Sequence, residues 1–303
     1  MNVLNKLIVS SLPAVPRSIV KKFASRYIAG EELSDAVAAV RSLNAKGILA
    51  TLDVLGEDIH RREEAVAATA TIAGVLDAIR REKLDSNVSI KLTQLGLKLD
   101  RAFCLENVLS IVTRAGEYGN FVRIDMEDST CTDDTLWVYR EVRKVRRNCG
   151  IVLQAYLRRT EDDARKLLGE GLTNFRLCKG IYVEHESIAY KTHEEINRNY
   201  SAVLRLMLEK GAYVGVATHD DELIQNAERD LRELQRSRDT YEFQMLLGVR
   251  PDLRAKVVEH GHRMRIYVPF GKQWYQYSIR RFKENPQVAG HVFKALFARN
   301  RHN

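Results

Sequence analysis

Short apolar runs alternate along the chain with longer segments in which apolar residues recur every three or four positions. Eight runs read as strands, at residues 47–55, 88–92, 120–126, 150–156, 174–179, 213–218, 241–246 and 262–268. Nearly all of them are apolar at successive positions, so we expect strands that are apolar on both faces, in a parallel sheet that helices cover.

The intervening segments predict amphipathic helices. In residues 220–235, apolar residues recur at spacings of three and four from Leu223 to Leu234, which places them on one side of a helix. An aspartate at position 220 or 221 suits the first turn, where a carboxylate meets unpaired N–H groups. The same periodicity extends over residues 58–83, 103–118 and 132–147.

Eight strand–helix units in series predict an α/β fold, a closed (βα)8 barrel. We expect the barrel to occupy residues 47–303 and an N-terminal helical arm to occupy residues 1–46. An open, doubly wound sheet is the alternative, but its G-x-G-x-x-G fingerprint is absent.

Composition narrows the class of protein. Hydrophobic residues make up 45% of the chain and charged residues 29%, which suits a soluble domain with a large core. No apolar run approaches the roughly 20 residues of a membrane span, and Pro13 breaks the apolar start, so we expect a cytoplasmic protein. The four cysteines form no C-x-x-C pair, and His185, His193, His260 and His262 have no familiar metal spacing, so no metal is expected.

The net charge of +8 raises the question of anionic partners. Basic residues mostly alternate with acidic ones and form no stripe with aromatics, so we expect no nucleic-acid partner. Basic residues do gather near the chain ends, which suggests weak, peripheral contact with an anionic membrane surface. They are Lys21, Lys22, Arg26, Arg280, Arg281, Arg299 and Arg301.

Polar residues interrupt the apolar runs toward their carboxyl ends, which in a barrel form a single rim. They are Glu57, Lys91, Asp125, Gln154, Arg176, Lys179, Thr218, His219, Gln244 and Tyr267. One charged residue at one strand end is more simply a loop ion pair. A whole set is costly to bury unless something pairs with it, so we expect a polar ligand in the mouth.

The last helical segment, residues 274–285, carries a second constellation. Tyr277, Arg280, Arg281 and Glu284 are spaced to share one face of that helix. Two adjacent arginines suit bidentate binding of a carboxylate, with Glu57 and Glu284 holding them in place. A solvated basic face is the alternative.

Taken together, eight segments resemble the proline dehydrogenase family, in family order. They are residues 51–57, 89–96, 123–128, 154–159, 175–182, 217–220, 242–250 and 265–285. The length is similar to that of the short monofunctional bacterial members. The resemblance implies a distorted (βα)8 barrel with FAD at the carboxyl rim and the eighth helix over the mouth. It also implies oxidation of L-proline to Δ1-pyrroline-5-carboxylate, the first step of proline catabolism, by hydride transfer from ring C5 to flavin N5.

The resemblance further implies roles for single residues. The proline carboxylate would bind Lys91, Arg280 and Arg281, beside a wall of Tyr267, Tyr277 and Leu246. Asp125 and Arg176 would form the catalytic centre, with Arg176 beside the flavin. Other flavin contacts would be Met126, Gln154, Lys179, Gly180, Ile181, Thr218, His219 and Gln244. The chain departs from the family pattern at Ile181, where a smaller residue is common, and at Val183, which replaces an aromatic.

Electrons would pass to a membrane quinone, given the family's habit and the missing dinucleotide fingerprint. The rival enzyme is a Schiff-base aldolase on the same barrel, with Lys179 or Lys91 as nucleophile. The non-enzymatic rival is a basic membrane- or nucleic-acid-binding protein, which would show steep salt dependence and no turnover.

Overall fold

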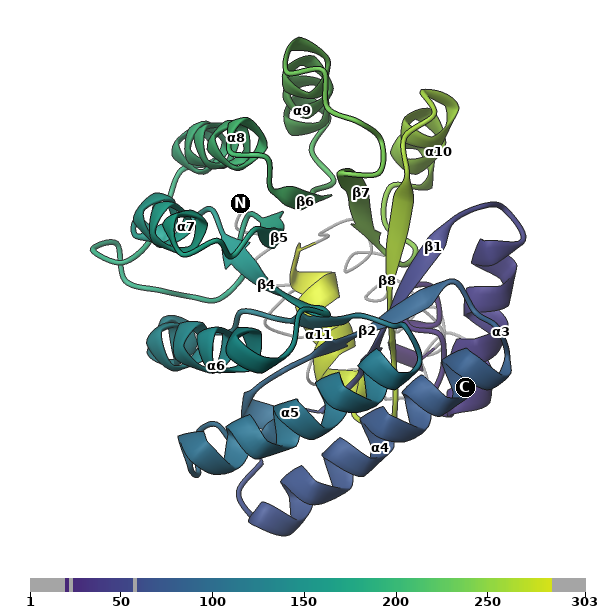
Figure 1. Cartoon of the computed structure of the whole chain (residues 1–303). Helices are drawn as coiled ribbons and strands as arrows, with labels where there is room; N and C mark the ends of the chain where they lie inside the picture. Colours follow the sequence, from purple (N-terminus) through teal and green to yellow (C-terminus); the bar gives the residue numbers. More distant parts are fainter. Residues whose placement is uncertain (1–19, 22–23, 57–58, 285–303) are drawn as a thin grey trace, which may run out of the picture.

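The computed structural model describes residues 20–21, 24–56 and 59–284, with side chains as far as residue 279. Eight parallel strands pair in sequence order, and the first pairs with the last, which closes a barrel (Figure 1). The strands are β1 (Leu49–Val54), β2 (Ser86–Ile90), β3 (Val122–Ile124), β4 (Cys149–Gln154), β5 (Asn174–Cys178), β6 (Tyr213–Ala217), β7 (Tyr241–Leu246) and β8 (Met264–Phe270). The predicted barrel is therefore confirmed, and the open sheet is not formed.

Each strand is followed by a helix. These are α4 (Arg62–Arg81), α5 (Arg101–Glu117), α6 (Thr132–Val145), α7 (Thr160–Gly169), α8 (His193–Glu209), α9 (Asp221–Glu233), α10 (Pro251–Glu259) and α11 (Trp274–Glu284), with short 3-10 turns η2 (Thr93–Leu95) and η3 (Ser129–Cys131). Asp220 caps α9 as predicted, because its carboxylate accepts the backbone N–H groups of Glu222 and Leu223. Leu223, Ala227 and Leu231 are buried.

Two helices depart from a simple ring around the barrel. The helix that follows β8, α11, contributes Tyr277 to the cavity at the mouth, and its Trp274 and Ile279 pack with Val20 and Ala24. A helix before the first strand, α3 (Leu33–Asn44), packs against β1 and β8 instead (Figure 1). The helix α3 thus covers the outer side of β1 and β8, a position that the helix after β8 would occupy in a regular barrel. The proposed boundary between residues 46 and 47 stays a prediction.

The two faces of the strands differ. Outward side chains such as Leu52 and Val88 are buried with the helices in one apolar core. Inward side chains are mostly polar, and Arg123, for example, donates to the backbone oxygen of Ile151 and to the side chain of Asn174. The expectation of apolar residues on both faces was therefore wrong for the inner face. Gly150 is needed there, because a Cβ at this position would collide with the guanidinium of Arg123.

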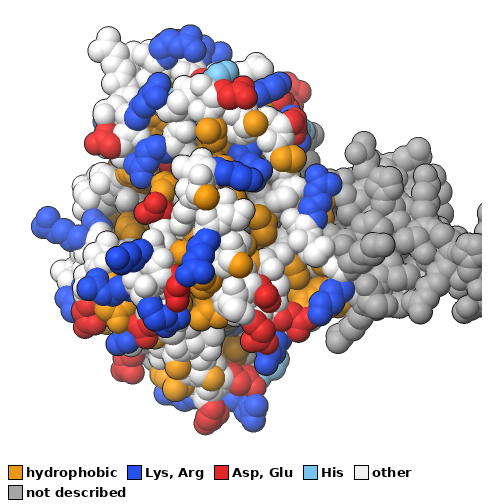
Figure 2. Space-filling model, turned by 90° about the vertical axis from the view of Figure 1, so that its right-hand side faces the viewer, with side chains coloured by type: hydrophobic (Ala, Val, Ile, Leu, Met, Phe, Trp, Pro, Cys, Tyr) orange, Lys and Arg blue, Asp and Glu red, His pale blue; other side chains and the backbone are white. Residues whose placement is uncertain are grey.

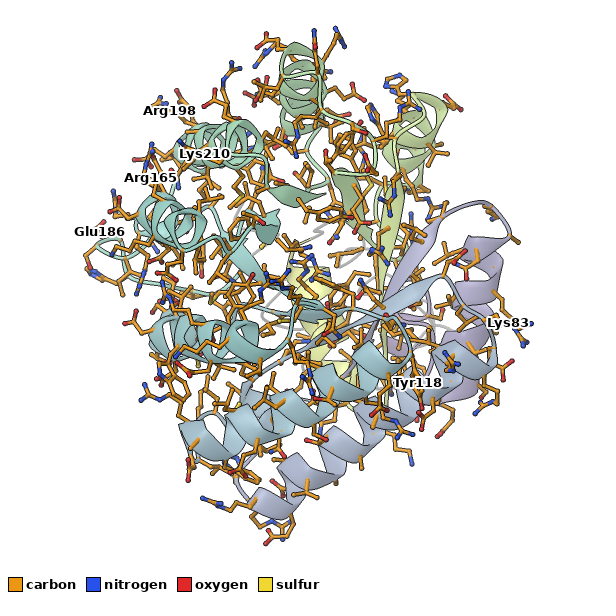
Figure 3. The ribbon with its side chains drawn as sticks, viewed as in Figure 1. Lys83, Tyr118, Arg165, Glu186, Arg198 and Lys210 are labelled. Carbon is orange, nitrogen blue, oxygen red and sulfur yellow. The ribbon has the colours of Figure 1, made fainter. Side chains whose placement is uncertain are left out.

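The surface carries charges of both signs. Figure 2 shows Lys and Arg side chains interspersed with Asp and Glu over one face, and Figure 3 shows Arg165, Glu186 and Arg198 pointing outward from the outer layer. Among the predicted basic ends, Lys21 is ion-paired with Glu31. Lys22, Arg299 and Arg301 lie outside the described residues. Within the described residues, no helix combines the length and apolarity that a membrane span requires.

Candidate active site

A cavity of about 670 Å³ opens at the carboxyl ends of the strands. Every predicted site residue whose side chain is described lines it: Lys91, Asp125, Met126, Gln154, Arg176, Lys179, Gly180, Ile181, Thr218, His219, Gln244, Leu246, Tyr267 and Tyr277. Arg280, Arg281 and Glu284 belong to α11, but their side chains lie outside the description, and so does Glu57. The sequence thus predicted which of the described residues converge on one cavity.

Arg176 is the centre of a network inside the barrel. It lies in the middle of β5, deeper than the rim, and is 6% exposed. Its guanidinium donates to Oδ1 of Asp125 at 2.7 Å, to Oγ of Ser89 at 3.1 Å and to the side-chain oxygen of Gln244. The hydroxyl of Tyr267 donates to the other oxygen of Asp125 at 2.8 Å. These contacts come from β2, β7, β8 and the residue that follows β3, so the guanidinium is held in one position before any ligand arrives.

Tyr267 remains protonated in this network. Burial, followed by the negative charges of Asp125 and Asp53, raises the pKa of Tyr267 well above its ordinary value. Its hydroxyl can therefore donate a hydrogen bond to Asp125 and, at the same time, accept one from the ammonium of Lys91 at 3.2 Å. The phenol joins the Arg176 network to the lysine.

Lys91 rests on a carboxylate that the sequence analysis did not select. Its Nζ lies 2.6 Å from Oδ1 of Asp53 and 3.9 Å from Oδ2 of Asp125. Asp53 is 1% exposed, and its Oδ2 makes no hydrogen bond within the described part of the chain. Burial raises the pKa of Asp53, with the charge of Lys91 opposing this and that of Asp125 adding to it. Lys91 is thus held by the carboxylate of Asp53, one of whose two oxygens has no hydrogen bond in the described part of the chain.

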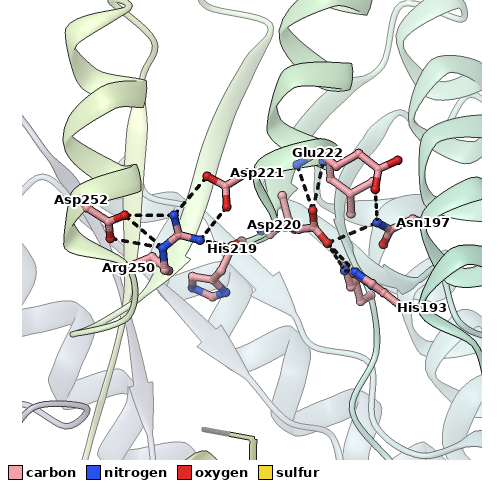
Figure 4. Close-up of polar contacts among 11 residues, drawn as sticks. His193, Asn197, His219, Asp220, Asp221, Glu222, Arg250 and Asp252 are labelled. Carbon is pink, nitrogen blue, oxygen red and sulfur yellow. Dashed lines mark hydrogen bonds and ion pairs between the residues drawn. The ribbon is translucent and has the colours of Figure 1, made fainter. Parts of the chain in front are cut away.

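A second cluster gathers around Asp220 (Figure 4) and includes Lys179, the residue after β5. Its Nζ donates to Oδ2 of Asp220 at 2.6 Å, and the same oxygen receives Asn197 at 3.2 Å and lies 2.9 Å from Nε2 of His193. Although burial acts to raise it, the hydrogen bonds of Lys179 and Asn197 and the lysine's charge lower the pKa of Asp220. One oxygen of Asp220 therefore caps α9, and the other positions Lys179.

The turn that carries Thr218 and His219 forms hydrogen bonds with the end of β7 and with the loop that follows it. Nε2 of His219 accepts the backbone N–H of Leu246 at 2.9 Å. Arg250 donates to both oxygens of Asp221, to Asp252 and to the backbone oxygen of His219 (Figure 4). Arg250 has a φ of 43°, in the left-handed region that is unfavourable for a side-chain-bearing residue. The ion pairs hold it there, and they fix this edge of the cavity.

The cavity has the features of a site for a large polar ligand. The side-chain oxygen of Gln154 is buried without a hydrogen-bond partner in the described part of the chain, while its NH2 group donates to the Met126 backbone. An unpaired buried acceptor costs about 1–3 kcal/mol, so a ligand N–H at this point would be favourable. Together with the ammonium of Lys179 and the imidazole of His219, this acceptor forms a set of polar groups that fits a flavin dinucleotide, whose ring is polar at one edge and whose pyrophosphate is anionic.

Several residues that line the cavity were not selected from the sequence: Val152, Cys178, Tyr182, Ala217, Asp220 and Met245. Three of them could have been found by strand alternation. Val152, Cys178 and Ala217 each share the inward face of a strand whose period is two residues. Asp53 could have been found in the same way, since it is the charged residue of an otherwise apolar run.

The geometry also bears on the aldolase alternative. A Schiff-base nucleophile must be a neutral amine. Lys91 is paired with Asp53 and Lys179 with Asp220, each at 2.6 Å, so both amino groups are already engaged by a carboxylate. Neither lysine is arranged as a nucleophile.

Comparison with known proteins decides the family. The family model for proline dehydrogenase matches residues 36–294. The chain belongs to the proline dehydrogenase family. It is 36% identical to proline dehydrogenase 1 of Bacillus subtilis over 273 residues, and 35% identical to proline dehydrogenase of Deinococcus radiodurans over 278 residues, with about 90% of each chain covered.

Solved structures agree on the fold. Proline utilization A (PutA) from Bdellovibrio bacteriovorus superposes with a TM-score of 0.82 at 25% identity, over 88% of this chain and 33% of that longer chain. PutA from Bradyrhizobium japonicum superposes with a TM-score of 0.73 at 19% identity, which supports the barrel alone. The resemblance to the short monofunctional members is confirmed, because the Bacillus protein is covered almost along its whole length.

Proposed function

We propose that this protein is an FAD-dependent proline dehydrogenase that oxidises L-proline to Δ1-pyrroline-5-carboxylate in the cavity at the barrel mouth. The observation that carries the proposal is the convergence of all described predicted site residues on one cavity. Family membership supplies the reaction class, and the network around Arg176 supplies a site able to perform it.

The cofactor would be held by groups along one side of the cavity. Gln154 would accept a ring N–H, and Lys179, Thr218 and His219 would bind the more polar remainder of the molecule. When bound, FAD would accept two electrons from the substrate as a hydride. Arg176, fixed by Asp125, Gln244 and Ser89, would place a permanent positive charge beside it.

Binding of the substrate carboxylate requires a positive charge that is not already balanced by a carboxylate of the protein. Lys91 faces Asp53, Arg176 faces Asp125 and Lys179 faces Asp220, so these cations are balanced by carboxylates. We therefore assign the additional charge to Arg280 and Arg281 of α11, the helix whose Tyr277 lines the cavity. Binding the carboxylate at this end would orient the ring while leaving its C–H bond free.

Asp125 would act as an anchor. Both of its oxygens already accept strong hydrogen bonds, one from Arg176 and one from Tyr267. The carboxylate therefore fixes two groups that face the cavity, and Leu246 and Tyr277 complete the wall beside them.

We further propose that electrons pass to a membrane quinone, from a cytoplasmic protein in peripheral contact with the membrane. The support is family habit and the basic residues of the chain ends. Electrostatic contact of this kind weakens with salt on the scale of a Debye length of about 8 Å. Sedimentation with anionic vesicles at low and high salt tests the contact, and its absence at low salt would remove this part of the proposal alone.

The test of function uses the purified protein. It should be yellow, release FAD on acid denaturation, lose its flavin absorbance on anaerobic addition of L-proline, and turn over with a soluble quinone faster than with NAD or oxygen. A colourless protein from which borohydride traps substrate on a lysine would support the aldolase. Turnover with NAD equal to that with quinone would overturn the acceptor.

A further inference from the structure

A cluster of metal-ligand side chains lies at the end of the barrel opposite the cavity. Glu228 lies in the second half of α9, and His260 and His262 flank the turn between α10 and β8. One ligand atom from each residue lies within 4.8 Å of the others. Oε1 of Glu228 is 2.8 Å from Nδ1 of His260 and 3.4 Å from Nε2 of His262.

The local fold brings these residues together. Helices of the barrel run antiparallel to the strands, so the end of α9 lies beside the beginning of β8. Gly261, with a φ of 77°, makes the turn that places both imidazoles on Glu228. A hollow of about 450 Å³ opens over the cluster, and His260 is exposed at its edge, whereas Glu228 and His262 are largely buried.

The ring of His262 is oriented by a further residue. The hydroxyl of Tyr241, the first residue of β7, lies 2.8 Å from its Nδ1. Such a contact fixes the ring and leaves Nε2, the nitrogen that faces Glu228, as the metal-binding atom. In metal sites, the ring nitrogen of a histidine ligand that does not bind the metal usually forms a hydrogen bond of this kind.

We propose that Glu228, His260 and His262 form a binding site for a late first-row divalent metal ion such as Zn²⁺. Imidazole and carboxylate are ligands that Zn²⁺ accepts, and three protein ligands leave its fourth position to water from the hollow. Mg²⁺ and Ca²⁺ are disfavoured, because they require mainly oxygen ligands.

The surrounding charges set a limit on affinity. Arg232, Arg236 and Arg238 line the same hollow and oppose a cation. Arg238 donates to the backbone oxygen of Gly261, and Arg236 to those of Leu208 and Ala212, so these two guanidiniums stabilise the loops around the site. We expect binding of Zn²⁺ in the micromolar range.

The histidine spacing gave no sign of this site in the sequence. His260 and His262 are two residues apart, and the third ligand lies 32 residues before the first of them, on a helix whose position depends on the closed barrel. The proposal therefore revises the expectation of no metal. A metal here would link α9 to the start of β8 without contact with the cavity.

The experiment is calorimetric titration of chelator-treated, FAD-loaded protein with Zn²⁺. Wild type should show one saturable site, and His262→Ala should bind at least tenfold more weakly. Glu228→Gln, which keeps the shape of the side chain, should lose affinity to a similar degree and covers the case in which His262→Ala folds poorly. His185→Ala removes an exposed histidine outside the cluster and should bind as wild type does.

Thermal unfolding provides a second, independent measurement of Zn²⁺ binding. Zn²⁺ should raise the melting temperature of wild type and of His185→Ala, and should have no effect on Glu228→Gln, because only the folded cluster gathers the ligands. Proline oxidation should be unchanged in all variants. The proposal is overturned if wild type shows no saturable binding below millimolar Zn²⁺, or if Glu228→Gln binds like wild type.

Discussion

Two buried carboxylates inside the barrel, Glu242 near the base and Asp53 near the mouth, have opposite surroundings. Glu242 receives Arg265 through both of its oxygens, at 2.6 and 3.0 Å, and also the side-chain NH2 of Gln244. Asp53 receives Lys91 on one oxygen and keeps the other without a hydrogen bond in the described part of the chain. Both residues are at most 2% exposed, so burial does not distinguish them.

Their pKa values move in opposite directions. Burial acts to raise the pKa of Glu242, but the charge and hydrogen bonds of Arg265 outweigh it, and the pKa is lowered. For Asp53 burial prevails over Lys91, and the pKa is raised. The carboxylate at the base of the barrel is therefore fully paired with an arginine, whereas the carboxylate near the mouth is only partly satisfied.

The largest effect is expected at the base. Glu242→Gln leaves Arg265 buried without its counter-ion, and breaking a buried pair in this way costs about 3–5 kcal/mol. Denaturant unfolding should show this loss at neutral pH. Glu161→Gln, which breaks a surface i,i+4 pair with Arg165, is the control and should cost less than about 1 kcal/mol.

The pH dependence of that loss has a definite sign. Because its folded pKa is lowered, Glu242 contributes stability above its unfolded pKa of about 4.3, and the contribution disappears as the pH falls below that value. The difference in unfolding free energy between wild type and Glu242→Gln should therefore shrink in acid. A difference that grows in acid would contradict the assignment.

At the mouth, Arg280→Met and Arg281→Met should each raise the KM for proline by about 10- to 1,000-fold, because a charge-assisted pair with the carboxylate is lost. The flavin spectrum should survive. A KM within twofold of wild type in both variants would mean that the pair is a solvated basic face.

Asp53→Asn should separate activity from stability. We expect kcat/KM to fall about tenfold or more, because Lys91 loses the carboxylate that holds it. The unfolding free energy at pH 7 should fall by less than in Glu242→Gln, since the raised pKa means that ionised Asp53 itself opposes folding, which offsets part of the cost of leaving Lys91 without its closest carboxylate. Rescue of kcat/KM by Asp53→Glu would indicate that the carboxylate itself is required.

The smallest effect is expected at the cofactor. Gln154→Met keeps the length of the side chain and removes the acceptor, so FAD should bind the apoprotein about fivefold more weakly, the equivalent of roughly 1 kcal/mol. Fluorescence titration with FAD measures this. Unchanged affinity would place the flavin ring elsewhere in the cavity.

The sequence predicted the strands to within a few residues, and β7 at residues 241–246 without error. It also predicted which side chains meet at the mouth, because parallel strands bring their carboxyl ends together. It did not predict the pairing of Asp53 with Lys91. That contact depends on the register of β1 against β2, in which Asp53 lies beside Ser89.

The packing of α3 against β1 and β8 was likewise not predicted. The apolar face of α3, with Ala36, Val40 and Leu43, predicts a packed helix without saying against which strands. The polar inner face was missed because each run contains only two or three inward positions, and single polar residues such as Ser89 and Arg123 look like exceptions in an apolar strand. Their partners come from strands far away in sequence.

The most direct test measures unfolding free energy and kcat/KM on the same preparations of Asp53→Asn and Glu242→Gln. The predicted result is an unequal pattern, in which Asp53→Asn loses a larger share of its activity than of its stability, while Glu242→Gln loses several kcal/mol of stability and a smaller share of its activity. If both variants lose stability and activity in the same proportion, the mouth and the base do not differ in the way proposed.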